Sequence, residues 1–288
     1  MSIRRRLRRA IGRPVAAVLV VLGLTGCNAM GNPTPEELFT GKQFDAARAI
    51  QAGDTERLRR LAAELEDIDA PGEKGMTLLW YAIQEDSLDS IRVLVELGSQ
   101  PDEQIVSGIG SVIDYAIFHD DTRFLEAMLD GGLDVDHQLD ESLTLLHRAA
   151  GPGGGLDHVQ ALVKRGAKIN ARSQVNVTPL LEAIDTSKPD VAEYLVKQGA
   201  DVNAITGRGA SVLYAVQDII ENQQSGSEMR QDYKRLRDLM IEKGAKHPPE
   251  SAEEVRQRAQ RQGFQEGPAS LDPLRYDEML LRQRRALE

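Results

Sequence analysis

The sequence predicts an all-α fold of stacked helix–turn–helix repeats with hairpin-like loops, followed by a helical C-terminal extension. Three observations support this prediction. A Thr or Ser that can start a helix recurs at steps of 33 or 34 residues, at Thr77, Ser111, Thr144, Thr178 and Ser211. A glycine that can end a helix in the left-handed conformation follows each start, at Gly98, Gly132, Gly166, Gly199 and Gly244. Two short apolar stretches with helical spacing lie between each start and its glycine.

Particular residues of this block resemble a known family. Residues 178–180 (Thr-Pro-Leu) with 199–204 (Gly-Ala-Asp-Val-Asn-Ala), and 144–149 (Thr-Leu-Leu-His-Arg-Ala) with 166–171 (Gly-Ala-Lys-Ile-Asn-Ala), closely resemble the ankyrin-repeat family. A period near ~33 residues is typical of that family. The resemblance implies an ankyrin-repeat solenoid in which each repeat packs only on its neighbours.

The pattern divides the chain into segments. We expect a lipoprotein signal peptide over 1–26, a tether over 27–43, an N-terminal capping repeat over 44–71, five ankyrin repeats over 72–250 and a charged helical tail over 251–288. The last repeat is longer than the others, and the extra residues lie at about 221–233, as an insertion between its two helices that forms either a loop or a helix extension on the surface.

The N-terminus predicts export and lipidation. Six arginines precede an apolar run over 15–24, which is too short to span a bilayer, since a span needs about 18 residues. The run ends Leu-Thr-Gly-Cys27, which resembles the bacterial lipobox, and Cys27 is the single cysteine of the chain. The alternatives are an uncleaved anchor and a twin-arginine signal, although the rest of that motif is missing. In lipoproteins an Asp after the cysteine commonly retains the protein in the inner membrane, so Asn28 favours the outer membrane, facing the periplasm.

The mature chain is strongly acidic. Residues 1–26 hold six of the 35 basic residues and none of the 45 acidic ones, so 29 basic and 45 acidic residues remain and the formal net charge is −16. Such a chain is not expected to bind nucleic acid, because phosphates attract Lys and Arg. The charge favours either a basic protein partner, steered by the acidic surface, or simply a well-solvated surface.

The resemblance also implies where a partner binds. In ankyrin folds the loop tips and inner helices form a concave groove, and the variable residues lie just before the helix start and just after the inner helix. Here these positions are Glu73, Lys74, Gln84, Glu85, Phe118, His119, Asp140, Glu141, Gln174, Asp185, Arg208 and Asp218. Phe118 is the aromatic among them, and it either anchors an interface or caps the core.

No arrangement of catalytic, cofactor-binding or metal-binding residues is present in the sequence. The five histidines lack zinc-site spacing, and the glycine run at 151–155 lacks the Lys-Ser/Thr ending of a phosphate loop. His147 occupies the family position at which a histidine braces neighbouring repeats. We therefore expect no cofactor and no metal, and an enzyme is the least favoured class.

Two functional hypotheses remain. The first is a lipid-anchored periplasmic protein that binds another protein through its concave face, in its sharpest form an immunity protein against a secreted antibacterial toxin such as a lipase. The second is a periplasmic accessory protein that supports oxidative-stress defence. The sequence leaves the oligomeric state open.

Overall fold

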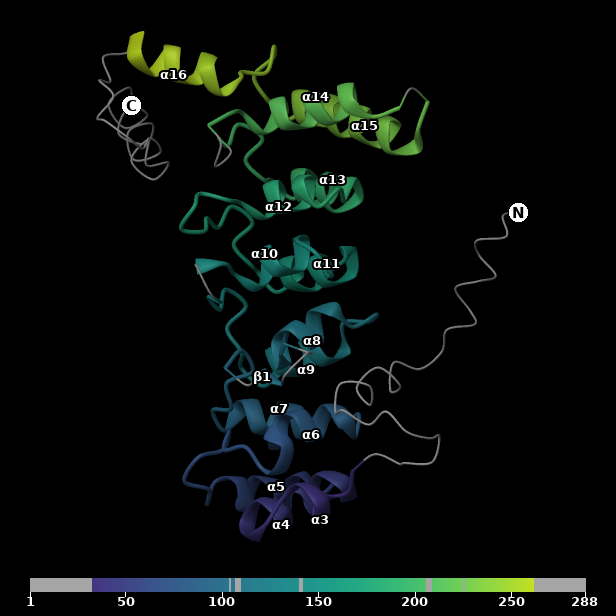
Figure 1. Cartoon of the computed structure of the whole chain (residues 1–288), viewed down its shortest axis with the longest axis vertical. Helices are drawn as coiled ribbons and strands as arrows, with labels where there is room; N and C mark the ends of the chain where they lie inside the picture. Colours follow the sequence, from purple (N-terminus) through teal and green to yellow (C-terminus); the bar gives the residue numbers. More distant parts are fainter. Residues whose placement is uncertain are drawn as a thin grey trace. The chain divides into compact units, whose positions relative to one another are not determined.

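The computed structural model describes residues 33–103, 105–106, 110–139, 142–205, 209–224 and 226–261 (Figure 1). The chain divides into two compact units, one ending at Asp134 and the other beginning at Val135. Both consist of paired helices, so the predicted all-α fold is confirmed. No helix of the described part is both long and apolar enough to cross a membrane, and the apolar run at 15–24 lies outside that part.

The first unit contains three helical hairpins, which we number as repeats one to three. The hairpins α4–α5, α6–α7 and α8–α9 stack in this order, because α4 packs on α6, α5 on α7, and α7 on α9. A two-residue antiparallel ladder, with Ile105 opposite Ser111, precedes the third hairpin. The element bounds are α3 Pro35–Leu38, α4 Gly41–Ala52, α5 Thr55–Ala62, η1 Glu73–Gly75, α6 Leu78–Gln84, α7 Leu88–Glu96, β1 Ile105–Val106, β2 Gly110–Ser111, α8 Val112–Phe118 and α9 Arg123–Asp130.

The predicted helix starts and stops of this unit are confirmed. Thr77 caps α6, since its Oγ1 accepts the backbone N–H of Trp80 at 3.2 Å, and Ser111 caps α8 in the same way. Gly98 and Gly132 follow the outer helices with φ of +102° and +96°, a conformation in which a Cβ would be strained.

The folded part begins before the predicted boundary at residue 44. Residues 35–38 form α3, capped by Thr34, and both Leu38 and Phe39 are buried. The ring of Phe39 meets that of Tyr81 edge-on at 5.6 Å between centroids. The segment 35–43, which the sequence assigned to a tether, therefore belongs to the packed unit.

The second unit contains repeats four to six and a further helix. The inner helices α10, α12 and α14 stack in order, as do the outer helices α11, α13 and α15. The bounds are α10 Leu145–Ala150, α11 Leu156–Lys164, α12 Pro179–Asp185, α13 Pro189–Lys197, α14 Val212–Asn222, α15 Glu228–Glu242 and α16 Ala252–Arg261.

Polar side chains join successive repeats at the loops. The backbone N–H of Asp201 donates to the side-chain oxygen of Asn170 at 2.8 Å, and that of Lys246 donates to Asn203 at 2.9 Å. Asp136 accepts the N–H of Lys168 in the equivalent place at 2.8 Å. These positions, which the sequence marks only as turn formers, therefore hold one repeat to the next.

The long last repeat extends its helices, which is one of the two forms expected for its additional residues. Helices α14 and α15 have 11 and 15 residues, whereas the paired helices of repeats four and five have six to nine. Tyr233, inside the predicted insertion, is fully buried, and its hydroxyl donates to the carbonyl of Ile184 at 3.1 Å. The prediction of a surface insertion is therefore wrong at this residue, because the longer helix packs back on repeat five.

The glycine run at 151–155 is a tight connection between α10 and α11. A Cβ on Gly154 would lie 2.2 Å from the carbonyl oxygen of Ala149, so only glycine fits there. The ammonium of Lys188 donates to the carbonyls of Gly151 and Gly154. The run therefore binds a side chain of the next repeat and joins the two helices of repeat four in a tight reversal.

Candidate protein-binding surface

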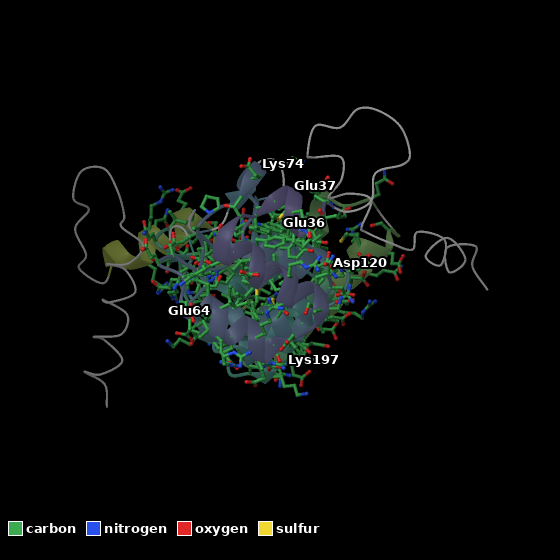
Figure 2. All side chains as sticks on the ribbon, turned by 90° about the horizontal axis from the view of Figure 1, so that it is seen from below. Glu36, Glu37, Glu64, Lys74, Asp120 and Lys197 are labelled. Atoms are coloured by element: carbon green, nitrogen blue, oxygen red, sulfur yellow. The ribbon has the colours of Figure 1, made fainter. Side chains whose placement is uncertain are left out.

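The candidate residues of the first unit gather at the loop before α6 and at the ends of the inner helices. Glu73 and Lys74 are exposed in η1, and Lys74 has a φ of +59° that turns the chain at the loop tip. Figure 2 shows Lys74 pointing outward at the rim of the unit, on a different side from Glu64. The loop tip therefore presents side chains to solvent, as the sequence predicted.

Phe118 is the exposed aromatic of this surface. It is the last residue of α8, and 45% of its surface is accessible. The same helix carries Tyr115, whose ring stands 5.5 Å from Trp80 and 6.0 Å from Phe124 between centroids. The exposed ring of Phe118 leaves apolar surface that a partner could cover, and its role as an interface anchor stays a prediction.

His119 is not available to a partner, although the sequence placed it on the binding surface. Its side chain is only 5% exposed, and its ring packs edge-on against Phe124 at 4.8 Å between centroids. The backbone N–H of Asp121 donates to His119 Nδ1 at 3.3 Å. The C-cap position turns this side chain inward, so the prediction of a contact residue fails here.

Gln84 and Glu85 end the inner helix α6 and are half-buried. The amide of Gln84 donates to the carbonyl of Pro33 at 3.4 Å, so it already holds the N-terminal segment. Burial raises the pKa of the neighbouring Tyr81, and the charge of Glu85 raises it further. Because the Gln84 amide already donates to Pro33, Glu85 is the more available of these two residues to a partner.

In the second unit the described candidates are exposed. Gln174 lies at a loop tip, Asp185 ends α12 and Asp218 lies on α14. Burial raises the pKa of Glu182 above its usual range, and the charge of Asp185 adds to this effect. The exposed negative charge of this surface therefore comes from Asp185 and Asp218. Asp140, Glu141 and Arg208 lie outside the described residues.

Sequence reasoning missed three exposed large apolar residues of this unit. Val175, beside Gln174, is 56% exposed, Tyr214 on α14 is 39% exposed, and Ile241 on the outer helix α15 is 37% exposed. Val175 could have been recognised, because it lies in a short polar stretch between two repeats where little core is available to bury it. Tyr214 could have been recognised from its position, which is equivalent to that of His147 in the last repeat of the described residues.

His147 is structural. The backbone N–H of Thr144 donates to its Nδ1 at 3.1 Å, so Nε2 carries the proton and donates to the carbonyl of Val177 in the next repeat at 2.9 Å. Burial lowers the pKa of His147 below its usual value of 6.5 and keeps the ring neutral. The described residues contain no group of three or more His, Cys, Asp or Glu side chains placed to hold a metal ion.

A family model described as ankyrin repeats, in three copies, matches residues 113–206. Residues 113–206 are ankyrin repeats. The match covers repeats three to five, which include Phe118, Gln174 and Asp185. Ankyrin repeats suggest a role in protein–protein interaction.

Curated relatives match parts of this ankyrin array. The chain is 30% identical over 154 residues to the B-cell lymphoma 3 protein homolog of Mus musculus, which covers 52% of this chain and 34% of the relative. It is 39% identical over 87 residues to protein phosphatase 1 regulatory subunit 27 of Mus musculus, and this match covers 30% of the chain and 54% of the relative. It is 28% identical over 135 residues to protein PhlB of Serratia liquefaciens, and this match covers 46% of the chain and 58% of the relative. The chain thus spans between about a third and a little over half of these proteins.

Two solved structures share the fold. The ankyrin repeat domain of Bcl-3 matches with a TM-score of 0.54 at 23% identity, over 73% of this chain and 90% of that chain. An ankyrin repeat domain from Acinetobacter baumannii AYE matches with a TM-score of 0.51 at 23% identity, over 70% of this chain and 98% of that domain. Together with the helical hairpins, these similarities establish the ankyrin-repeat fold.

Proposed function

We propose that this chain is a lipid-anchored periplasmic protein that binds another protein through the loop tips and inner-helix ends of its ankyrin repeats. The observation that carries the proposal is Phe118. A large apolar side chain that remains 45% exposed at the end of a packed helix gains free energy from burial only when something else covers it. Aromatic residues in rigid surroundings are also common anchors of protein interfaces.

The acidic residues of the second unit indicate the kind of partner. Asp185 and Asp218 are exposed, Glu182 is half-buried near Asp185, and the mature chain carries a formal charge of −16. Exposed negative charges accelerate association with a basic partner and disfavour acidic ones. We therefore propose a protein partner with a basic binding surface, and no nucleic acid.

The anchor proposal follows from the lipobox-like ending at Cys27. Residues 28–34 separate Cys27 from the first packed helix at Pro35, and seven residues span at most ~25 Å when extended. A diacylated or triacylated Cys27 would therefore hold the array close to the bilayer. Asn28 favours the outer membrane over the inner one.

The sharpest form of the proposal is an immunity protein that blocks a secreted antibacterial toxin, such as a lipase, where the toxin reaches the periplasm. An acidic surface with an apolar anchor, held at the membrane, is suited to capture such a protein. The competing form is an accessory protein for oxidative-stress defence. The identity of the partner separates these forms, whereas both require the same surface.

Capture from detergent-solubilised envelope followed by mass spectrometry tests this function. We expect the wild-type chain to retain a partner, and Phe118→Ala to lose most of it. Ile241→Ala is the matched control, because Ile241 is 37% exposed on the outer helix α15 and belongs to no candidate position. If Phe118→Ala and wild type recovered equal amounts of partner, Phe118 would not be the interface anchor. A retained hydrolase would favour the immunity form, and a retained catalase the accessory form.

A further inference from the structure

Helix α14 has a polar face that is turned away from the core of the last repeat. The buried residues of the helix lie together on its opposite side, namely Val212, Leu213, Val216 and Ile220. Tyr214, Asp218 and Glu221 follow one another at spacings of four and three residues, and all three are exposed. An aromatic ring and two carboxylates therefore share one face of this helix.

A cavity of about 440 Å³ lies on this face. Besides the three exposed residues, side chains of α14, of α15 and of the loop after α15 line it, namely Gln217, Arg237, His247 and Pro249. Most of the lining is polar or charged, and an apolar ligand would take these groups out of water without giving them a hydrogen bond. The cavity therefore fits a polar occupant.

The two carboxylates of the cavity are held in place by their own helix. The side-chain amide of Asn222 donates to Asp218 Oδ1 at 3.1 Å, and that of Gln217 donates to Glu221 Oε1 at 2.8 Å. Neither carboxylate forms an ion pair with any other described residue. Their positions are therefore fixed while their charge is left uncompensated.

The one basic side chain of the lining does not cancel this charge. Arg237 donates from Nε and Nη2 to Asp238 Oδ1, at 2.9 and 2.6 Å, so its charge is compensated outside the lining. His247 is exposed and adds a positive charge only when it is protonated. The cavity therefore carries a net negative charge and is complementary to a cation.

We infer that this cavity receives an arginine side chain of the protein partner. A guanidinium group is planar and can stack on the ring of Tyr214 while its N–H groups donate to the carboxylates of Asp218 and Glu221. A lysine ammonium is a point charge and lacks the planar group that stacks on a ring. The inference rests on the proposed function, because it places part of the partner's basic surface on repeat six.

Peptide binding to the full chain tests the inference without the partner. The probe is a hexapeptide of alternating glycine and arginine, compared with lysine and citrulline versions at about pH 8, where histidine side chains are neutral. Citrulline has nearly the shape of arginine but no charge. We expect the arginine peptide to bind about tenfold more tightly than the citrulline peptide, with the lysine peptide between them. Equal binding of the arginine and citrulline peptides, or tighter binding of the lysine peptide, would overturn the inference.

Two paired variants separate the cavity from the overall charge of the chain. Asp218→Asn with Glu221→Gln removes both charges and keeps an oxygen for each helix hydrogen bond, and it should lower the affinity for the arginine peptide about tenfold. Asp157→Asn with Asp190→Asn removes the same charge from exposed positions of α11 and α13 and should change the affinity less than about twofold. Tyr214→Ala should weaken binding about threefold, whereas Tyr214→Phe should not. Equal losses in the two paired variants would overturn the cavity as the site.

The assay also distinguishes a second copy of the chain as the occupant. If the wild-type chain bound no arginine peptide, sedimentation would show whether it forms a dimer that Asp218→Asn with Glu221→Gln dissociates. Such a dimer, or a monomer that binds no peptide, would overturn the inference. Capture of a protein that depends on Phe118 would still stand in either case, whereas a chain that binds the peptide but captures no protein would overturn the proposed function alone.

Discussion

Replacing His147 by leucine tests the claim that single polar contacts couple the repeats of the second unit. His147 accepts the N–H of Thr144 on Nδ1 and donates from Nε2 to the carbonyl of Val177. Leucine fits the space in this kind of junction, since Leu181 occupies the equivalent position of repeat five and is buried. His147→Leu therefore removes the two contacts while keeping the packing nearly intact.

The expected cost follows from the groups left behind. The carbonyl of Val177 keeps the backbone N–H of Ser173 at 3.0 Å as a donor, so loss of the His147 hydrogen bond costs about 1 kcal/mol, the usual net contribution of one hydrogen bond. Loss of the contact that completes the Thr144 cap costs about 1 kcal/mol. The leucine side chain recovers part of this through burial, at about 25 cal/mol per Å² of apolar surface. We expect the free energy of unfolding of the second unit to fall by about 1–2 kcal/mol near neutral pH.

The same residue predicts a dependence on pH. The folded-state pKa of His147 is lowered, chiefly by burial, whereas the unfolded value is near 6.5. The unfolded chain therefore binds the proton more readily, and stability falls as pH decreases through 6.5 towards the folded pKa. Each unit of this depression corresponds to about 1.4 kcal/mol. His147→Leu has no such proton to bind, so its stability should change less with pH than that of wild type.

Urea unfolding at about pH 8 and about pH 5, with hydrogen exchange of peptides from repeats four and five, measures both effects. His247→Gln is the control, because His247 is exposed and should change neither the stability nor its pH dependence. If His147→Leu were as stable as wild type at the higher pH, or if both chains lost stability equally on acidification, the proposed coupling through His147 would be refuted.

Three further predictions concern the core, the glycine run and the anchor. Leu195→Ala, at a fully buried position of α13, should lower the free energy of unfolding by about 2–5 kcal/mol. Hydrogen exchange should also increase in α11 and α15, because both helices pack on α13, and an increase confined to α13 would contradict coupled repeats. Gly154→Ala should lower the urea midpoint because its Cβ would meet Ala149, whereas Gly155→Ala, with open space around its Cβ, should not; equal midpoints would contradict the close approach. Cys27→Ser should accumulate as an unprocessed precursor on gels of whole envelope, and maturation at normal size with retention in the membrane would exclude a lipid anchor.

The repeat pattern could be predicted from sequence because its determinants are local. Thr77, Ser111, Thr144, Thr178 and Ser211 each cap the helix that the sequence placed after them. A capping hydroxyl acts within three residues, and a left-handed glycine acts within the turn, so neither needs knowledge of distant contacts. Phe118 could be nominated for the same reason, since its position at the end of an inner helix follows from the period.

The misplaced residues depend on contacts that a repeat pattern does not contain. Tyr233 lies in a polar stretch, and only its contact with Ile184, 49 positions earlier, shows that it is core. His119 has the spacing of a surface residue, but packing on Phe124 turns it inward. Leu38 and Phe39 follow two prolines and resemble a linker until repeat two is present to bury them. In each case tertiary packing overrode the local pattern.

Binding kinetics of the captured partner test the central claim most directly. Surface plasmon resonance at two salt concentrations would compare wild type with Phe118→Ala and Asp185→Lys, with Ile241→Ala as the control. A buried aromatic anchor is worth about 2 kcal/mol or more, so Phe118→Ala should accelerate dissociation about thirtyfold with the helical content unchanged by circular dichroism. Asp185→Lys should slow association and weaken its salt dependence. Rates equal to those of the control for both variants would show that the partner does not bind the inner-helix ends of this ankyrin array.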